Sequence, residues 1–387
     1  MKPRKIGKFL AVDSKTSRMN GTKGRLMKNH LLFQSMPRRT FLATGAMVLL
    51  YGWERSSYQR THGAEADTPA AKPASKSKLL IWRETKFVFV TPEGKEVGEL
   101  AGHPEKLVIL NEPVLSPDGK RVAFAANEYP PTDEKGNLRR HVFVRDVDGK
   151  DHSVKIAINA LNVSWTPDGK KLVVAEFLPA KELKDMAFAA WLVDVGSKEK
   201  TQLELPRRAH VYCMTPDSKS FVADIFDPDA RKIHLALIGR DGKKVTRLIE
   251  VKTEGADPKL SPDGTSLLFQ DYDSTDKREK DMPRLDRLFV YDFRTKNRTR
   301  LVEVPLNALI TGYCWSPDGK QIAYTWKQVQ PGVPLAVNTN NMNDPKLNTE
   351  TESHLMIADA DGKNARTVLS AKANSAPTIT IQYVDWR

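Results

Sequence analysis

The segment from Trp315 to Lys320 reads WSPDGK and lies between two apolar runs, which is the form of a tight turn joining two β-strands. In such a turn Ser or Thr can bind the turn backbone, Pro holds φ at about −65°, and Gly takes a left-handed conformation. Ser218 replaces that Gly in one related segment, at a cost of about 1 kcal/mol. The related segments are LSPDGK, WTPDGK, MTPDSK and LSPDGT, which begin at Leu115, Trp165, Met214 and Leu260.

The five copies recur at a nearly constant interval. Their prolines lie at positions 117, 167, 216, 262 and 317, so successive copies are 46 to 55 residues apart, a spacing typical of the blades of a β-propeller. A second β-rich run follows each copy, as at His141–Val144 and Leu355–Asp359, and several end in Asp-Gly-Lys. These Asp-Gly pairs could indicate calcium loops, but the further carboxylates of such a site are missing. The runs are therefore predicted to be third strands with their hairpin turns.

The two ends of the chain are expected to supply a sixth blade. The segment Tyr383–Trp386 resembles the strand that precedes a motif, and the sequence reaches Arg387 where the turn would begin. Two β-rich segments, Leu79–Arg83 and Phe87–Val90, and the hairpin turn Pro92–Lys95 that leads to a third strand lack an inner partner. We predict an all-β, six-bladed β-propeller over residues 79–387, whose last blade combines one C-terminal and three N-terminal strands. Such a blade closes the ring and covers the strand edges.

The positive charge of the chain is concentrated before the repeats. The chain has 61 Lys and Arg against 48 Asp and Glu, a net charge of +13. Residues 1–66 hold 13 of the basic and 3 of the acidic residues, so the remainder carries 48 against 45, a net charge of +3. The basic pI therefore does not indicate a nucleic-acid partner.

The N-terminal region has the form of an export leader. Arg38-Arg39 precedes an apolar stretch of 13 residues, Phe41–Trp53, and a small-x-small site ends at Ala66. This resembles a twin-arginine signal, so we expect a leader over residues 1–66, a flexible linker over 67–78 and an extracytoplasmic or periplasmic propeller. An uncleaved anchor and a cytoplasmic tail remain alternatives, although 13 residues fall short of the ~20 that span a bilayer. The true start is Met1 or Met36.

The two cysteines, Cys213 and Cys314, occupy equivalent places in non-adjacent repeats. Equivalent positions two blades apart exceed the roughly 7 Å Cα separation that a disulfide tolerates. We therefore interpret both as buried, small, apolar side chains.

The repeated [LW][ST]PDGK motif, an apolar strand and a DGK turn resemble the WD-repeat-like propeller family typified by TolB, over the whole of residues 79–387. Related repeats build the propellers of prolyl-oligopeptidase-like peptidases and of oligogalacturonate lyases. The resemblance implies a propeller used for binding, with catalysis optional.

The sequence favours a binding module over an enzyme. A peptidase of this kind needs a Ser nucleophile in a G-x-S-x-G elbow, and no such segment occurs. A lyase would use metal-bound histidines, and none of the six histidines after residue 66 pair at metal-ligand spacing. His210, expected just before an innermost strand, is the best candidate. We predict no catalytic residues, no metal, no cofactor and no stable membrane span after processing, and a protein partner or a glycan at the cell envelope.

A carbohydrate-binding or carbohydrate-processing propeller is the alternative. Carbohydrate binding would place aromatic side chains at the channel mouth, and Tyr212, Tyr313 and Tyr383 are assigned to one register of the innermost strands. Packing between blades is the competing interpretation of these tyrosines, and the sequence favours it.

The long insertions predict which face of the propeller binds. The SPDG and DGK turns share one face, whereas connections between second and third strands share the other. Long insertions occupy four of the latter connections: Asn127–Arg140, Phe177–Phe188, Asp271–Arg287 and Lys327–Ser353. Loops carried on a rigid scaffold commonly hold function. The predicted binding residues are Tyr129, Arg139, Arg140, His210, Asp271, Tyr272, Lys327 and Asn341.

Overall fold

The computed structural model describes most of the chain from residue 77 onward. The described ranges are 77–83, 86–100, 107–109, 112–132, 138–148, 154–178, 187–227, 229–253, 256–272, 286–305, 308–329, 350–372 and 381–387. The predicted leader and nearly all of the linker lie outside these ranges. Within them, no helix has both the length and the apolar character needed to cross a membrane.

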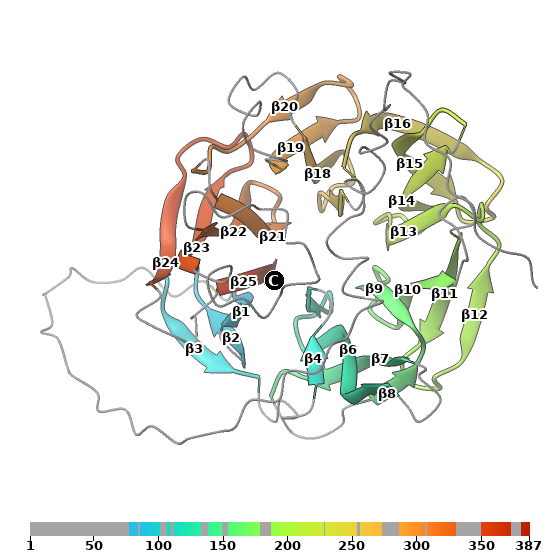
Figure 1. Ribbon diagram of the computed structural model, residues 1–387, viewed down its shortest axis with the longest axis horizontal. Helices are drawn as coiled ribbons and strands as arrows, with labels where there is room; N and C mark the ends of the chain where they lie inside the picture. Colours follow the sequence, from blue (N-terminus) through green and yellow to red (C-terminus); the bar gives the residue numbers. More distant parts are fainter. Residues whose placement is uncertain are drawn as a thin grey trace, which may run out of the picture. The chain divides into compact units, whose positions relative to one another are not determined.

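Six antiparallel sheets surround a common axis, as Figure 1 shows for residues 77–387. This confirms the predicted six-bladed β-propeller. We number the blades by their motifs and give the composite blade the number 6. Blade 1 contains β4 (Leu107–Ile109), β5 (Val114–Leu115), β6 (Arg121–Thr132), β7 (Leu138–Asp146) and β8 (Val154–Ala157). Blade 2 contains β9 (Ala160–Trp165), β10 (Lys171–Leu178), β11 (Ala187–Asp194) and β12 (Lys200–Leu203).

The other four blades have four strands each. Blade 3 contains β13 (Ala209–Met214), β14 (Ser220–Asp227), β15 (Lys232–Gly239) and β16 (Val245–Val251). Blade 4 contains β17 (Lys259–Leu260), β18 (Ser266–Tyr272), β19 (Asp286–Asp292) and β20 (Arg298–Arg300). Blade 5 contains β21 (Ala308–Trp315), β22 (Gln321–Val329), β23 (Glu350–Asp359) and β24 (Arg366–Lys372). Blade 6 contains β25 (Ile381–Trp386), β1 (Leu79–Arg83), β2 (Lys86–Val90) and β3 (Glu96–Glu99).

The repeated motif forms the turn between the first and second strands of its blade, as predicted. In the first copy, Gly119 N donates to Ser116 O at 2.8 Å, and Arg121 N donates to Ser116 Oγ at 2.9 Å. Gly119 has a φ of +68°, and Ser218 adopts a φ of +58° at the equivalent place in the third copy. The left-handed position inferred from the sequence is therefore present even where the residue is not glycine.

The composite blade closes the ring, also as predicted. Strand β25 pairs with β1, with Leu79 opposite Trp386 and Ile81 opposite Val384. The register corrects one detail. Val384, rather than Tyr383, takes the place that Tyr313 has in blade 5, where Trp315 pairs with Ile322 and Tyr313 with Tyr324. Tyr383 is three residues before Trp386, whereas Tyr313 is two before Trp315, and it stands at a bulge with a φ of +52°.

The core lies in the seams between neighbouring blades. Each hydrophobic cluster joins residues of two adjacent sheets, as in the cluster that packs Val142 of blade 1 with Val163 and Val174 of blade 2. The motif tryptophans tie blades together as well. Trp165 Nε1 donates to Val114 O of the preceding blade at 3.0 Å, and Trp315 Nε1 donates to Lys259 O at 3.0 Å. The ring is therefore a rigid scaffold for the loops between its strands.

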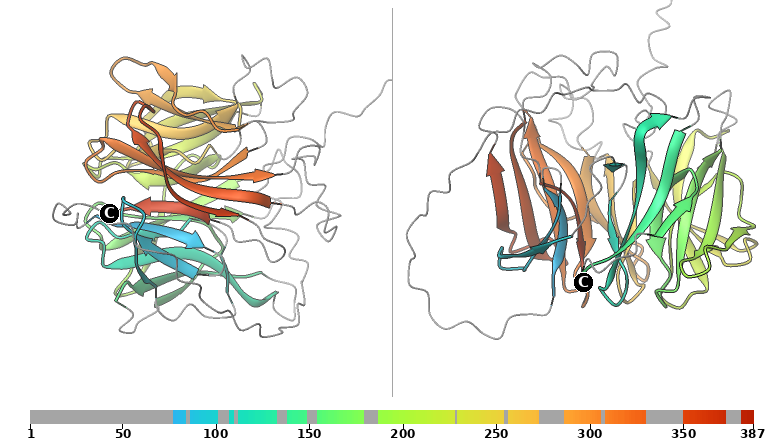
Figure 2. Two further views of the ribbon diagram at one scale, coloured as in Figure 1. Left: turned by 90° about the vertical axis from the view of Figure 1, so that its left-hand side faces the viewer. Right: turned by 90° about the horizontal axis from the view of Figure 1, so that it is seen from below.

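The strands run between two unlike faces, which Figure 2 shows from the side. We call the face that carries the motif turns the turn face, and the face that carries the second-to-third-strand connections the insertion face. Strands extend further into the insertions than expected: β22 continues to Val329 and β23 begins at Glu350. The residues between these two strands are therefore 330–349, fewer than the predicted insertion Lys327–Ser353.

Candidate functional site

The described binding candidates lie toward the insertion face in four different blades. Arg140 is near the start of β7, Asp271 near the end of β18 and Lys327 near the end of β22. His210 lies within the innermost strand β13, opposite Asp224 on β14, and not just before that strand as predicted. The strand begins earlier because its ladder with β14 already includes Ala209. For the remaining candidates, the structure places only the backbone of Tyr129, Arg139 and Tyr272 in strands, and Asn341 is outside the described residues.

Asp271 is used inside the protein. Its side chain is fully buried and accepts hydrogen bonds from Lys252 N at 2.7 Å and Thr253 N at 2.9 Å. Arg298 Nη1 lies 2.6 Å from Asp271 Oδ2, and its guanidinium also covers the Phe289 ring at 3.7 Å. Asp271 therefore ties blade 4 to the connection that arrives from blade 3. We do not retain it among the proposed partner contacts.

His210 belongs to a polar cluster that joins blades 2 and 3. Its Nε2 is 2.8 Å from Asn162 Oδ1 of β9. On its other side Nδ1 is 3.9 Å from Asp224 Oδ2, and the Tyr212 hydroxyl donates to the same oxygen at 2.7 Å. The ring of Phe188 stacks on the imidazole with centroids 4.9 Å apart. The sequence indicated His210 and, separately, Tyr212, but not Asn162, Phe188 or Asp224, because these residues come from other strands of the chain.

The electrostatics of this cluster favour a fixed hydrogen-bond network. Burial raises the pKa of Asp224, and His210 and the Tyr212 hydroxyl oppose that rise. Burial together with the Asp224 charge raises the pKa of Tyr212 well above its usual value, so the phenol remains a donor at neutral pH. Among the described residues, no group of three or more His, Cys, Asp or Glu side chains could hold a metal ion. The donor set around His210 thus does not fit a metal centre.

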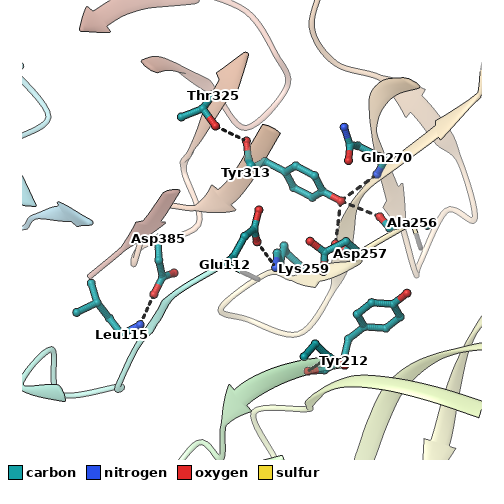
Figure 3. Close-up of polar contacts among 12 residues, drawn as sticks. Glu112, Leu115, Tyr212, Ala256, Asp257, Lys259, Gln270, Tyr313, Thr325 and Asp385 are labelled. Atoms are coloured by element: carbon teal, nitrogen blue, oxygen red, sulfur yellow. Dashed lines mark hydrogen bonds and ion pairs between the residues drawn. The ribbon is translucent and has the colours of Figure 1, made fainter. Parts of the chain in front are cut away.

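An ion pair crosses the axis of the ring. Glu112, which precedes β5 in blade 1, lies 2.6 Å from Lys259 Nζ in the opposite blade 4, and Asp257 Oδ1 is 3.3 Å from the same nitrogen. Figure 3 shows these side chains meeting between the innermost strands. A Cβ added to Gly312 of blade 5 would lie 2.9 Å from Glu112 Oε1 and 2.6 Å from Tyr383 Cα. At this level the axis is therefore filled by protein atoms.

The sequence did not single out Glu112 and Lys259. Both stand within five residues before a motif proline, on the stretch that lines the axis. That position could have predicted that Glu112 and Lys259 line the axis, but it does not show which residue of the opposite blade each side chain would contact.

The tyrosines of the innermost strands serve packing. Tyr212 and Tyr313 are buried, and the Tyr313 hydroxyl donates to Ala256 O at 2.7 Å and accepts from Gln270 N at 3.2 Å, both in blade 4. Figure 3 shows this ring reaching across to the neighbouring blade. The two buried rings agree with packing between and within blades rather than with a row of exposed sugar-binding platforms.

The cysteines are free thiols, as expected from their places in non-adjacent repeats. Cys314 is buried, whereas Cys213, which packs against the apolar cluster between blades 3 and 4, is half-buried rather than buried as predicted. Burial raises the pKa of Cys213 to about 11 and raises that of Cys314 well above its usual value. Both therefore stay protonated at neutral pH and are poor nucleophiles.

Comparison with known proteins supports the fold. No family model and no curated protein matches the chain. Among solved structures, a structure from Agrobacterium tumefaciens that carries the provisional name TolB is 14% identical, with a TM-score of 0.48, over 80% of this chain and 97% of that one. A chain of the nidogen/laminin complex is 9% identical, with a TM-score of 0.50, over 80% and 98%.

An oligogalacturonate lyase in complex with manganese is also similar, at 15% identity and a TM-score of 0.44, over 75% of this chain and 72% of the lyase. At such low identities these likenesses concern the β-propeller fold alone.

Proposed function

We propose that this protein is an exported, non-catalytic β-propeller that binds a protein partner at the cell envelope through its insertion face. The observation that carries the proposal is the placement of the long insertions. All four open from the same face of one closed ring, in blades 1, 2, 4 and 5. Surface loops lengthen at little thermodynamic cost on such a scaffold, and loops carried on one face of a rigid scaffold commonly hold function.

The chemistry of the insertion face supports binding better than catalysis. The acid–base groups found there are engaged with one another, as His210, Tyr212 and Asp224 are. The thiols of Cys213 and Cys314, which lie in seams between blades, are protonated. The twin-arginine leader expected from Arg38 and Arg39 supports export, and the propeller resemblance typified by TolB supports an envelope location.

Replacing the insertion of blade 5 tests the proposed face. Residues 330–349 would be exchanged for a short Gly/Ser turn, because the ladder between β22 and β23 extends to the pair Val329 and Glu350. The melting temperature should remain nearly unchanged, while the affinity for the partner captured from envelope extract should fall at least tenfold, or about 1.4 kcal/mol.

The turn face provides the matched control. Lys120, Lys170 and Lys320 are exposed on three motif turns, and their replacement by Glu should leave capture unchanged. If the insertion replacement is harmless and the lysine replacements abolish capture, the partner binds the opposite face and the proposal is wrong.

A carbohydrate-directed propeller is a second candidate, and one observation favours it. The half-buried Phe188 stacks on His210 beside a carboxyl group, an arrangement of aromatic, imidazole and acid groups that a sugar could use. Fluorescence titration with galacturonate oligomers distinguishes the two candidates. Saturable binding that is lost in Phe188→Ala and His210→Ala, without loss of folding, would favour the carbohydrate function over the protein-binding one.

A further inference from the structure

The seam between blades 1 and 2 is apolar along β6 and β7 and becomes polar at the insertion face. Along β6 and β7, the residues that face blade 2 alternate and belong to one apolar cluster with it: Ala123, Ala125, Val142 and Val144. The next pair in the same alternation is Asn127 and Arg140, which lie directly opposite each other across the two strands. Cross-strand partners share one side of a sheet, so both side chains extend the seam toward blade 2.

Arg140 is buried without a counter-ion in the described part of the chain. It is 4% exposed, and its Nη1 donates to Ala160 O of β9 at 3.2 Å. No carboxylate within the described ranges is paired with it, and its Nε has no hydrogen-bond partner there. Burial alone lowers the pKa of Arg140, yet a guanidinium stays charged in proteins. A buried cation without an anion is costly, and a bound anion would offset that cost.

Another arginine of the same ring shows the usual solution. Arg298 has the Asp271 carboxylate at 2.6 Å, so its charge is neutralised within the chain. The neutral amide of Asn127 lies opposite Arg140 across the two strands, and its Oδ1 is buried and without a partner among the described residues. The end of this seam therefore offers one cationic donor beside one neutral acceptor.

A polypeptide carboxylate complements this set of groups. The carboxylate would accept from Arg140 Nε, and a neighbouring backbone N–H would donate to Asn127 Oδ1, so that buried groups on both sides are satisfied. A phosphate dianion lacks the donor. Cross-strand Cβ atoms lie about 5 Å apart, which matches the short separation between an acidic side chain and its own backbone.

We propose that Arg140 binds a carboxylate of an acidic segment of the partner protein at the insertion end of the seam between blades 1 and 2. The inference rests on the proposed function and specifies the partner's chemistry. Asn127 orients the segment by accepting a backbone hydrogen bond.

Peptide titration of the folded protein tests the inference. The probe is a capped tetraglutamate peptide, compared with capped tetraglutamine at equal ionic strength. The ¹⁵N–¹H signal of Arg140 Nε, identified by its loss in Arg140→Gln, should shift saturably with tetraglutamate alone. The apparent Kd from thermal shifts should weaken at least tenfold in Arg140→Lys, which keeps the charge but loses Nε, and in Arg140→Gln.

Arg121→Gln is the matched control. Arg121 joins the same two blades at the turn face, where its Nη2 donates to Gly169 O at 2.7 Å and its guanidinium lies 4.7 Å from the Trp165 ring centroid. Losing this bond should lower the melting temperature without changing the Kd for tetraglutamate. An equal loss of peptide affinity in Arg121→Gln would assign the effect to blade packing and overturn the inference.

Three further results would overturn it. A response of the Arg140 Nε signal to galacturonate oligomers as strong as that to tetraglutamate would assign the carboxylate to a glycan. A shift of this signal in an Asp133→Asn, Glu134→Gln variant without any ligand would assign the carboxylate to the chain itself. If capture of the partner is lost on replacing residues 330–349 but unchanged in Arg140→Gln, the proposed function stands and this inference fails. If capture survives the loop replacement, the proposed function is wrong, and the peptide titration of Arg140 still decides this inference by itself.

Discussion

At the scale of single residues, the repeated motif is a self-contained unit of turn chemistry. In each copy the Ser or Thr hydroxyl donates to the motif Asp, as Ser316 does to Asp318 at 2.7 Å. That hydrogen bond is the main cause that lowers the pKa of the motif carboxylates, which also accept from the backbone two residues later. The same holds for Asp118, Asp168, Asp217 and Asp263. These acidic groups therefore shape turns and are not ligand-binding residues.

The left-handed position of the motif allows a paired prediction. Ser218→Gly should raise the free energy of unfolding by roughly 0.5 to 1 kcal/mol, because a side chain at a φ of +58° is strained. Gly119→Ser should lower it by a similar amount, since among the described residues an added Cβ would meet Arg387 Cβ alone, at 3.9 Å, and backbone strain dominates. Urea denaturation of both variants measures the difference. Changes of the same sign in the two variants would contradict this account.

At the scale of elements, one strand closes the ring. Strand β25 buries Ile381, Val384 and Trp386 and pairs with β1, while the Asp385 carboxylate accepts from Leu115 N of blade 1 at 2.6 Å. At Gly312 strands β21 and β25 approach closely, because a Cβ there would lie 2.6 Å from Tyr383 Cα. The last strand thus connects blades 5, 6 and 1.

Removal of residues 381–387 should lower the free energy of unfolding by several kcal/mol. Each buried apolar side chain of β25 contributes about 1.5 to 3 kcal/mol, and the edge of β1 would be exposed. The melting temperature measures the loss, and a synthetic peptide of residues 381–387 should restore part of it. An unchanged melting temperature would show that the ring does not depend on the composite blade.

At the scale of the whole molecule, the propeller separates a repetitive face from a variable one. The turn face repeats the same motif in five blades, whereas the insertion face carries the Arg140 end of one seam and the His210 cluster of another. The pair formed by Glu112 and Lys259 links opposite blades across the axis at 2.6 Å. Such a ring can present loops to a partner without changing its own shape.

Export should depend on the paired arginines of the leader. Replacing Arg38 and Arg39 together by Lys is expected to retain the precursor in the cytoplasm, because the charge pattern before the short apolar run directs recognition. Cell fractionation and N-terminal sequencing measure the outcome, with a processed product near Asp67 expected for the unaltered chain. Arg55→Lys, beyond the apolar run, is the control. Normal processing of the double variant would show that another route or no export signal operates.

The sequence by itself determined the six-bladed ring, because the features that specify it are local. A turn of this type is specified by four consecutive residues, as in Ser316–Gly319. Five copies of it at a regular interval predict blades of similar size. The composite blade followed because the segments at the two ends complete one pattern.

Only the tertiary structure decided the site, because its contacts join residues far apart in the chain. Asp271 proved to be a buried anchor for Lys252 and Thr253, although its place in an insertion suggested a surface role. The direction of each side chain, and the charge it meets across a seam or across the axis, depends on how whole blades pack, and no local pattern encodes that packing.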